Sequence, residues 1–485
     1  MKILFIEVFL DIINWEINYN PGVASIAAVL KKNLFDVEIY PVYKKQDVSF
    51  LLKYIKNNNF DVIGFTVTEP TFKSVAKISK KIKKNHPNIF IICGGLYAIL
   101  NPSIIIDEIN CDAACIGEGE MAMLELVKRI NKKEKYIYNI KNLLFKKNRK
   151  IVKNPLATPL NINKLPDPDR KIFHKWNLDK YTGNIYLKNG LRGGVVVISR
   201  GCFYNCSFCG NWHLNAQYKG KFRRVLSPNI ATLKLKRIVD EYKYDYFIFI
   251  DAQFPTNEGW LKEFTKFYQK RVKIPFTIQL RFGSFNKKTA ELLKKAGCYF
   301  VQIGLESGDE NIRSKILNKK ITYQQIQNGV RIFKNQRVDV GINNIIGIPK
   351  ETPSKFIKTI KINALLNIDY SYLFILYPYK GTQLYKYCYK HKLLRKKNIN
   401  YFNKIDTKLK LKKFKRKDIL YYYQNFQPLV NIYKKSLSNN KLISAIWRKL
   451  FNIYATCPTD RKGFWGQLAF WSDKIRVSKF IYNKV

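Results

Sequence analysis

Three cysteines with the spacing of metal ligands stand near the middle of the chain. Cys202, Cys206 and Cys209 lie in the segment SRGCFYNCSFCG and form the pattern CxxxCxxC. Thiolates are the soft ligands that iron–sulfur clusters need. Three thiolates on one short loop would bind three irons of a four-iron cube. The fourth iron would stay open to a substrate or cosubstrate, as an open position marks catalytic metal sites. The spacing therefore predicts a [4Fe–4S] cluster with one open corner.

Other uses of these cysteines fit the sequence less well. A structural zinc site usually pairs two knuckles of two-residue spacing, and the second knuckle is missing. A disulfide within the segment would leave one cysteine over, and Cys298, Cys388 and Cys457 are far away in the sequence. Nine cysteines in 485 residues are too few for a disulfide scaffold. A cluster in a reducing compartment, the cytoplasm, is the interpretation that these counts favour.

The cysteine segment follows the first strand of an alternating strand and helix pattern. Strands are predicted at 195–199, 246–250, 276–280, 300–303, 340–345 and 372–376, with helices between them. Six βα units fit a partial (β/α)6 barrel better than a full eight-stranded one. Active sites of βα barrels lie on the loops after the strands, where the cysteines are expected to lie.

A second α/β pattern occupies the N-terminal part of the chain. Strands are predicted at 2–9, 37–43, 61–67, 89–93 and, as the last one, 113–116, with helices at 20–32, 48–56, 73–84 and from about 120 to 130. Such alternation predicts a parallel, doubly wound sheet that binds ligands at the carboxyl ends of its strands. Small residues at or near those ends would let a flat ligand and its nucleotide tail approach the backbone: Gly64, Thr66, Thr68, Gly94 and Gly95. No GxGxxG follows the first strand, which argues against a nicotinamide domain.

Changes in composition and the positions of the prolines divide the chain into four parts. We expect an α/β domain at 1–135, a proline-rich linker with at most one hairpin at 136–190, the partial barrel at 191–395, and a basic helical region at 396–485. In the last part helices are predicted at 418–435, kinked or split by Pro428, and at 442–454. No apolar stretch is long enough for a spanning helix, and the N-terminus fits a buried strand better than a signal peptide.

The formal net charge of +52 has two explanations. A polyanion such as RNA or an acidic membrane could be the partner. Alternatively, A-T-rich codons favour Lys, Asn, Ile, Tyr and Phe together, and lysines scattered over helix faces lie in solvent. The basic and aromatic residues of 408–417 and 421–423 leave RNA binding, a membrane surface and a helical cap on the barrel open.

The cysteine segment resembles the motif of the radical S-adenosylmethionine (SAM) superfamily, with Phe208 in the aromatic position. The resemblance implies that the amino and carboxylate groups of SAM chelate the open iron. It also implies one-electron cleavage of SAM to methionine and a 5′-deoxyadenosyl radical. Four later segments match the superfamily in order, namely 246–257, 276–282, 304–308 and 345–352. They imply SAM contacts by Asp251, Arg281, Glu306, Ser307, Gly347 and Ile348.

The N-terminal part resembles the cobalamin-binding domain of one radical SAM class. The matching segments are NPGVA at 20–24, the strand ending at 66, Gly94-Gly95, GEGE at 117–120 and LPDPDR at 165–170. The resemblance covers about 1–395 and implies cobalamin contacts by Gly64, Thr66, Thr68, Gly94, Gly95, Gly117 and Glu118. The chain departs from the DxHxxG pattern, because residues 9–15 contain no histidine. Either cobalamin binds without a protein histidine below the cobalt, or the pocket no longer binds it.

The resemblance implies a cobalamin-dependent methyltransferase that acts on an unactivated carbon of a small-molecule or lipid-like substrate, with flavodoxin or ferredoxin as reductant. An oxidative cyclase of the magnesium-protoporphyrin type, a tRNA methylthiotransferase and a non-catalytic cobalamin or redox sensor are the alternatives. The tRNA enzymes fit less well, because Cys93, Cys111 and Cys115 lack the spacing of their second cluster. A small-molecule or lipid-like substrate is therefore favoured over a nucleic-acid partner, which stays open. The intact cysteine motif argues against a sensor.

Overall fold

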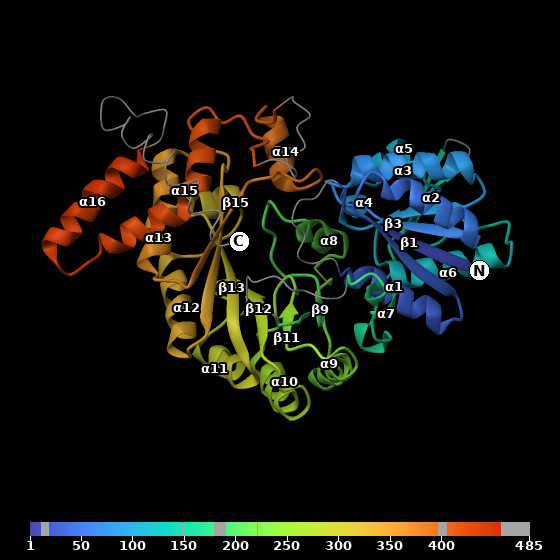
Figure 1. Cartoon of the computed structure of the whole chain (residues 1–485), viewed down its shortest axis with the longest axis horizontal. Helices are drawn as coiled ribbons and strands as arrows, with labels where there is room; N and C mark the ends of the chain where they lie inside the picture. The colour runs from blue at the N-terminus through green and yellow to red at the C-terminus, as the bar shows by residue number, and fades with distance from the viewer. Residues whose placement is uncertain (11–18, 148–149, 179–190, 221, 396–404, 457–485) are drawn as a thin grey trace. The chain divides into compact units, whose positions relative to one another are not determined.

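A computed structural model describes residues 1–10, 19–147, 150–178, 191–220, 222–395 and 405–456. The chain forms two compact units (Figure 1). The first unit comprises Met1–Gln279, Leu292–Cys298 and Tyr379–Lys386. The second unit comprises Leu280–Glu291, Tyr299–Pro378 and Tyr387–Val485.

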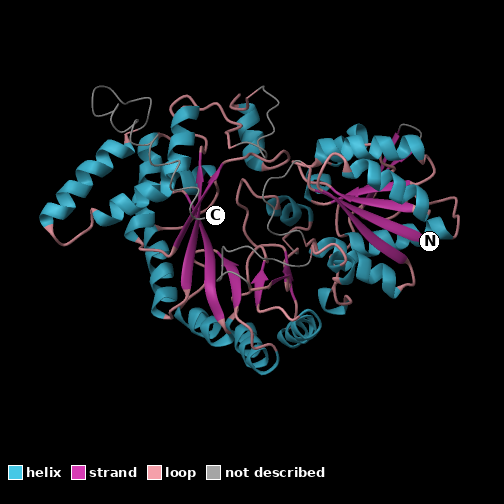
Figure 2. Cartoon of the chain, in the orientation of Figure 1, coloured by secondary structure: helices cyan, strands magenta, loops and turns pink. Residues whose placement is uncertain are grey.

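The first unit begins with a seven-stranded sheet in the order β2-β1-β3-β4-β5-β6-β7 (Figure 2). Its strands are β1 (Lys2–Val8), β2 (Asp36–Val42), β3 (Val62–Thr66), β4 (Phe90–Gly94), β5 (Ala113–Cys115), β6 (Leu143–Lys147) and β7 (Lys150–Lys153). The pairs among β1–β5 are parallel, with Lys2 opposite Asp36 and Ile3 opposite Val62. The predicted strands and their parallel arrangement are therefore confirmed up to β5.

Helices cover both faces of this sheet. One face packs on α1 (Pro21–Lys32) and α6 (Gly119–Asn131). The other packs on α2 (Asp47–Asn58), α3 (Phe72–Asn85), α4 (Leu96–Leu100) and α5 (Pro102–Glu108). Because both faces are covered, β1 is a continuous apolar run that is buried almost throughout. The side chain of Asn20 accepts hydrogen bonds from the backbone N–H groups of Gly22 and Val23, and Pro21 fills the first helical turn.

The prediction that β5 is the last strand of this sheet is wrong. The segment expected to be a linker with at most one hairpin contains β6 and β7, and β6 pairs antiparallel with β5. The reason is that β6 buries Leu143, Leu144 and Phe145 in succession, while β7 is an exposed edge strand between two lysines. Such a short apolar run between polar residues gives a weak pattern in the sequence.

The six strands predicted for the second α/β domain are all present. In the first unit β8 (Gly193–Val196), β11 (Tyr246–Phe249) and β12 (Phe276–Leu280) are parallel neighbours, accompanied by α9 (Pro228–Tyr242) and α10 (Glu258–Arg271). In the second unit β13 (Cys298–Glu306), β14 (Asp339–Ile346) and β15 (Tyr370–Ile375) are parallel neighbours, with α12 (Tyr323–Asn335) and α13 (Pro353–Leu365). The α11 helix (Lys287–Ala296) precedes β13. The predicted α/β class with six βα units is thus confirmed.

One predicted strand is divided in two. After β8 the chain turns and forms β9 (Ser199–Arg200), which pairs antiparallel with β10 (Arg224–Val225). The cysteine loop and α8 (Asn211–Gln217) lie between these two short strands in the sequence. The loop is therefore held at both ends by one antiparallel pair.

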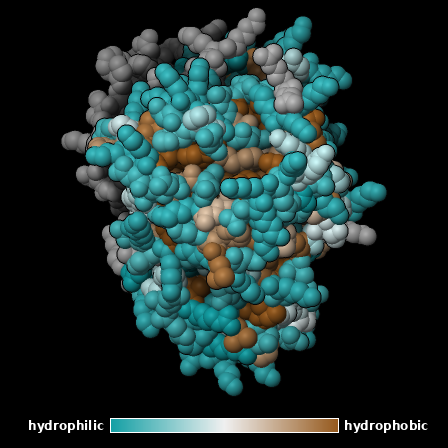
Figure 3. All heavy atoms as spheres, turned by 90° about the vertical axis from the view of Figure 1, so that its right-hand side faces the viewer, coloured by the Kyte–Doolittle hydropathy of each residue, from teal (hydrophilic) through white to brown (hydrophobic). Residues whose placement is uncertain are grey.

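The described residues of the predicted C-terminal region, 405–456, contain α15 (Arg416–Lys435) and α16 (Lys441–Ala455), as predicted, and α14 (Gln383–Lys390) precedes this region. The α15 helix continues through Pro428, so the expected split does not occur. No helix within the described ranges is both long and apolar enough to cross a membrane. The face in Figure 3 is largely hydrophilic, with hydrophobic residues in small separate areas.

Candidate active site

The three cysteines lie together on the loop between β9 and α8. Gly201 has a φ of 78°, and a Cβ there would lie 2.8 Å from the ring of Phe222. The side-chain amide of Asn215 donates to the Cys202 carbonyl at 2.6 Å, and the Cys209 N–H donates to the Cys206 carbonyl at 3.1 Å. A glycine in the left-handed region and two hydrogen bonds therefore fold the loop back on itself.

The thiols of this loop differ from the other thiols in the described ranges. Cys202, Cys206 and Cys209 form no disulfide and are partly exposed. The other cysteines of the described ranges also form no disulfide and are all buried: Cys93, Cys111, Cys115, Cys298 and Cys388. Among the cysteines that the structure describes, the loop thiols are thus the ones placed to take up a ligand from outside.

The donor set on the loop fits an iron–sulfur cluster. Across the residues with described positions, no three His, Cys, Asp or Glu side chains lie close enough together to hold a single metal ion. Three thiols on one loop are the kind of donors that an iron–sulfur cluster takes. The contacts to the sulfurs include two neutral amides, with Asn211 Nδ2 at 3.6 Å from Cys209 Sγ and Gln253 Oε1 at 4.0 Å from Cys202 Sγ.

Arg223 and Asp251 hold the chain on either side of the loop. The guanidinium of Arg223 donates to Ser199 Oγ at 2.6 Å, to the Gly201 carbonyl at 2.9 Å and to the Gln253 carbonyl at 2.8 Å. Asp251 accepts from the Ser199 hydroxyl and, at 3.1 Å, from the Ile198 N–H. Asp251 is 1% exposed, and burial raises its pKa to about 6. Its carboxylate therefore orients the turn before the cysteines, and a contact with SAM stays a prediction.

The SAM residues predicted at the last strands lie in the second unit. Glu306 ends β13 with a φ of 68°, and its carboxylate lies 2.7 Å from the ammonium of Lys319, with both side chains buried. Ser307 follows, fully buried. Gly347 and Ile348 follow β14, and their N–H groups donate to Glu351 Oε2 at 2.7 and 3.2 Å. Because carboxyl ends of neighbouring parallel strands meet at one edge, these two segments lie at the same edge of the β13–β14 pair.

Arg281 and Phe208 are the other two residues predicted to contact SAM. Arg281 comes directly after β12, as expected, and its carbonyl accepts from the Ser284 N–H and hydroxyl. Phe208 is half-buried beside Cys209 in the loop. Their roles toward SAM stay predictions.

An open cavity of about 510 Å³ lies within the first unit, at the carboxyl edge of the N-terminal sheet. Six of the seven residues predicted for cobalamin line it: Gly64, Thr66, Gly94, Gly95, Gly117 and Glu118. The NPGV segment at 20–23 and the prolines at 166 and 168 also line it. The lining also includes residues 197–201, Asn211 and Phe222, which flank the three cysteines in the sequence.

Thr68 is the exception among the predicted residues. It is not part of the cavity lining, and it pairs with Thr71 in the turn before α3. Thr68 lies two residues beyond the end of β3 at Thr66. Strand ends can be located from the sequence only to within a few residues, and a contact of Thr68 with cobalamin stays a prediction.

Small residues keep the cavity open to the backbone. Gly64 stands where a Cβ would lie 2.7 Å from the ring of Phe5. Gly95 has a φ of 91°, and a Cβ there would lie 3.0 Å from the Val67 carbonyl oxygen. A bulky, flat ligand can therefore approach these backbones closely. No histidine belongs to the described lining, and residues 11–18 of the departing DxHxxG region lie outside the described ranges.

A buried acid that the sequence analysis missed lies behind the cavity wall. Glu7 Oε1 accepts from Asn20 Nδ2 at 2.9 Å and from Thr66 Oγ1 at 3.0 Å, and both partners line the cavity. Burial raises the pKa of Glu7 to about 7. A glutamate within a strand of apolar residues was the signal in the sequence that could have revealed it.

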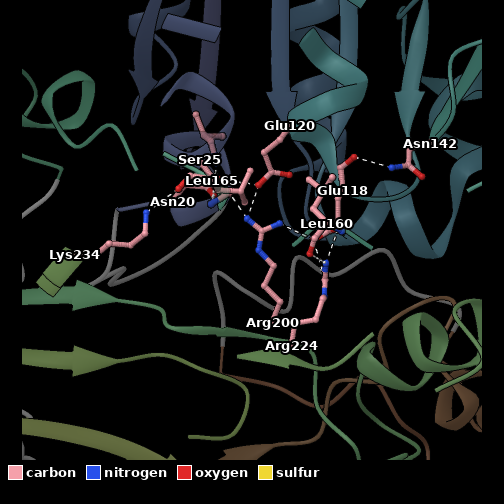
Figure 4. Close-up of polar contacts among 12 residues, drawn as sticks. Asn20, Ser25, Glu118, Glu120, Asn142, Leu160, Leu165, Arg200, Arg224 and Lys234 are labelled. Carbon is pink, nitrogen blue, oxygen red and sulfur yellow. Dashed lines mark hydrogen bonds and ion pairs between the residues drawn. The ribbon is translucent and has the colours of Figure 1, made fainter. Parts of the chain in front are cut away.

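Glu118, which lines the cavity, also binds other parts of the protein. Its carboxylate accepts from Arg200 Nη1 at 2.6 Å, from Arg224 at 2.8 and 2.9 Å, and from the Leu160 N–H at 2.8 Å (Figure 4). Burial by itself would raise the pKa of Glu118, but Arg224 and Arg200 outweigh burial and lower the pKa. A contact between Glu118 and cobalamin stays a prediction.

The fold and the site together define a class of protein. An α/β domain has a cavity at its strand ends, and a loop with three partly exposed cysteines follows the first strand of a second α/β domain. A sequence model of the radical SAM superfamily matches residues 196–362, and a model of the B12 binding domain matches residues 16–127.

Related proteins match most of the chain. An "uncharacterized methyltransferase" of Pyrococcus horikoshii is 31% identical over 82% of this chain and 84% of its own length. The anaerobic magnesium-protoporphyrin IX monomethyl ester cyclase of Rubrivivax gelatinosus is 24% identical over 76% of this chain and 66% of its own length. The chain therefore belongs to the radical SAM superfamily and carries an N-terminal B12 binding domain. The cofactors of such proteins are a [4Fe–4S] cluster, SAM and cobalamin, as the resemblance implied.

Solved structures share the fold. OxsB, a cobalamin-dependent SAM radical enzyme, superposes with a TM-score of 0.69 over 98% of this chain and 75% of its own, at 15% identity. The radical SAM methyltransferase TsrM of Kitasatospora setae superposes with a TM-score of 0.64 over 82% of this chain and 79% of its own, at 15% identity. The predicted order of domains, a cobalamin-binding-type α/β domain followed by a radical SAM domain, is confirmed.

Proposed function

We propose that this chain is a cobalamin-dependent methyltransferase that transfers a methyl group to an unactivated carbon of a small-molecule or lipid-like substrate. One observation carries the proposal. In the first unit, the cavity at the sheet edge is lined both by the predicted cobalamin segments and by residues directly before the three thiols. A methyl carrier and a radical source would then stand close together. The Pyrococcus relative and TsrM, both described as methyltransferases, support the same choice.

The residues have distinct roles in this proposal. Cys202, Cys206 and Cys209 hold the cluster, and Phe208, Asp251, Arg281, Glu306, Ser307, Gly347 and Ile348 bind or position SAM. When bound, the cluster and SAM supply a carbon-centred radical, and cobalamin supplies a methyl carrier. Gly64, Thr66, Gly94, Gly95 and Gly117 present backbone and small side chains to the cobalamin. Glu118 holds the two arginines, and its role is positioning.

Apolar side chains form part of the cavity wall. Phe222, Leu214 and Leu226 contribute apolar surface to the cavity. A radical is quenched by any nearby hydrogen donor, so a dry and rigid pocket protects it. We also propose the domain bounds 1–135, 191–395 and 396–485, a reductant of the flavodoxin or ferredoxin type, and a location in the cytoplasm, a reducing compartment in which thiols rarely form disulfides.

A radical-based oxidative cyclase is the second candidate. The match to the magnesium-protoporphyrin cyclase of Rubrivivax gelatinosus over 76% of this chain is the observation that favours it. Both candidates need the cluster and SAM, so they differ in the product and in the fate of the methyl group.

The cluster proposal is tested with anaerobically reconstituted protein and SAM. Wild-type protein should form 5′-deoxyadenosine, and Cys206→Ala should form none, because one iron loses its ligand. Cys388→Ala, which changes a buried cysteine outside the loop, should keep the activity. Formation of 5′-deoxyadenosine by Cys206→Ala at the wild-type rate would refute the assignment.

The cobalamin proposal needs a separate measurement. Protein purified without oxygen should contain cobalt and corrin together with iron. Iron without cobalt, and no binding of added cobalamin, would remove the methyltransferase proposal and leave the cluster assignment standing.

A further inference from the structure

Two arginines at the ends of the cysteine segment converge on one acidic residue of the N-terminal domain. Arg200 lies on β9, two residues before Cys202, and Arg224 lies on β10, where it is the register partner of Arg200. All three cysteines lie between them in the sequence. Both guanidinium groups donate to the carboxylate of Glu118, as Figure 4 shows. The segment that carries the thiols is therefore fastened at both ends to the same carboxylate.

A second carboxylate completes the network. Arg200 also donates to Glu120, which lies in the first turn of α6 and is 3% exposed, and to Ser25 Oγ of α1 at 3.2 Å. Ser25 in turn donates to Glu120 Oε1 at 2.7 Å. Two arginine charges thus meet two glutamate charges, so the buried group is neutral as a whole. A guanidinium matches this task, because its planar fork can bond two carboxylates at once.

The same residues face the cavity. Ser25, Glu118, Glu120 and Arg200 all belong to its lining. A molecule in the cavity therefore contacts the network that holds the cysteine segment. A shift of the cysteine segment and the binding of a ligand in the cavity would therefore both affect the hydrogen bonds of this network.

We propose that the Arg200–Glu118–Arg224 network is a positioning device that fixes the cluster-bearing loop against the cobalamin cavity. This inference rests on the proposed function, since it assigns the network to the cluster and cobalamin of that site. Arg200 and Glu118 are positioning residues in this role, because they act on the cofactors through the cysteine loop and the cavity wall. Loss of the network leaves the three thiol ligands in the chain and changes where they stand.

The test compares Arg200→Met, Arg200→Lys and Glu118→Gln with a matched control. Arg129→Met is the control, because Arg129 lies on α6 in the same unit, is 19% exposed against 25% for Arg200, and pairs with Glu125. Arg129 contributes nothing to the cavity lining. Each holoenzyme is assayed for iron content, for the electron paramagnetic resonance spectrum of the reduced cluster with and without SAM, for 5′-deoxyadenosine formation, and for cobalamin affinity by visible absorbance.

The Arg200 and Glu118 variants should retain their iron, because their cysteines are intact. They should show an altered cluster spectrum on addition of SAM, and a loss of about 10- to 100-fold in 5′-deoxyadenosine formation and in cobalamin affinity, the range typical of outer-shell substitutions. Arg200→Lys should recover part of the loss through its charge, but its compact ammonium lacks the planar fork with which the guanidinium bonds Glu118 and Glu120. If Arg200→Met does not fold, Arg200→Lys and Glu118→Gln decide the matter.

Spectra, cleavage rates and cobalamin affinities within about twofold of Arg129→Met would overturn the inference. This failure is distinct from failure of the proposed function. If wild-type protein forms no 5′-deoxyadenosine, the proposed function fails. If wild-type protein forms it and the Arg200 and Glu118 variants match the control, only the positioning role fails.

Discussion

Glu351 makes the stability of the second unit depend on pH in a way that one substitution can test. Its side chain is 2% exposed and accepts from the N–H groups of Gly347 and Ile348, in the loop after β14 that is proposed to lie along SAM. Burial raises the pKa of Glu351 from 4.5 to about 8, because the backbone donors do not offset the lost hydration. The substitution Glu351→Gln keeps an oxygen for both donors and removes the titration.

The magnitude follows from the two pKa values. Below pH 4.5 the carboxyl is protonated in the folded and the unfolded chain, so it carries no electrostatic cost. Between 4.5 and about 8 the folded protein keeps a proton that the unfolded chain has lost, so the free energy of unfolding falls as pH rises. At about 1.4 kcal/mol per pH unit, the total loss is about 5 kcal/mol by the upper end of this range. The glutamine variant should therefore equal the wild type near pH 5 and exceed it above pH 8.

Urea unfolding, followed by circular dichroism at several pH values between 5 and 9, measures this difference. The wild-type curve should fall more steeply with pH than the Glu351→Gln curve. Glu310→Gln is the control, because Glu310 is an exposed glutamate of the same unit, and its curve should run parallel to the wild type. Parallel curves for wild type and Glu351→Gln would refute the reasoning that Glu351 is protonated in the folded protein.

Two further substitutions test the cavity and the core. Gly95→Ala should lower cobalamin affinity and cost about 1–3 kcal/mol of unfolding free energy, because it adds a Cβ 3.0 Å from the Val67 oxygen at a φ of 91°. Cobalamin titration and thermal unfolding measure the two effects. Gly220→Ala is the control, because Gly220 also has a positive φ but has open space around it. Asn363→Leu should cost about 1–3 kcal/mol in urea unfolding, because it leaves the buried amide of Asn344 without its reciprocal partner at 2.9 and 3.1 Å. The double leucine variant should recover part of that loss, and an unrecovered double variant would count against the amide pair as the cause.

The sequence alone was sufficient for the features that depend on short-range order. The three thiols lie on one loop because their spacing is local, and no distant residue is needed to bring them together. The six strands of the second domain and the first five of the N-terminal sheet follow from short apolar runs, several of which, such as β1 and β11, are buried on both faces. The glycines at the cavity could be predicted, because the carboxyl ends of parallel strands meet at one edge wherever the helices lie.

Contacts between distant segments were decided only by the tertiary structure. Glu118 lines the predicted cavity, and it also binds Arg200 and Arg224, which are 82 and 106 residues away in the sequence and which no local pattern predicted. A Gly-Glu pair before a helix has the same local pattern whether its carboxylate meets a ligand or an arginine. The choice depends on which charges the fold brings within hydrogen-bond distance. The pairing of β6 with β5 is of the same kind, since edge pairing depends on the neighbour that leaves its backbone groups open and not on the residues of the strand itself.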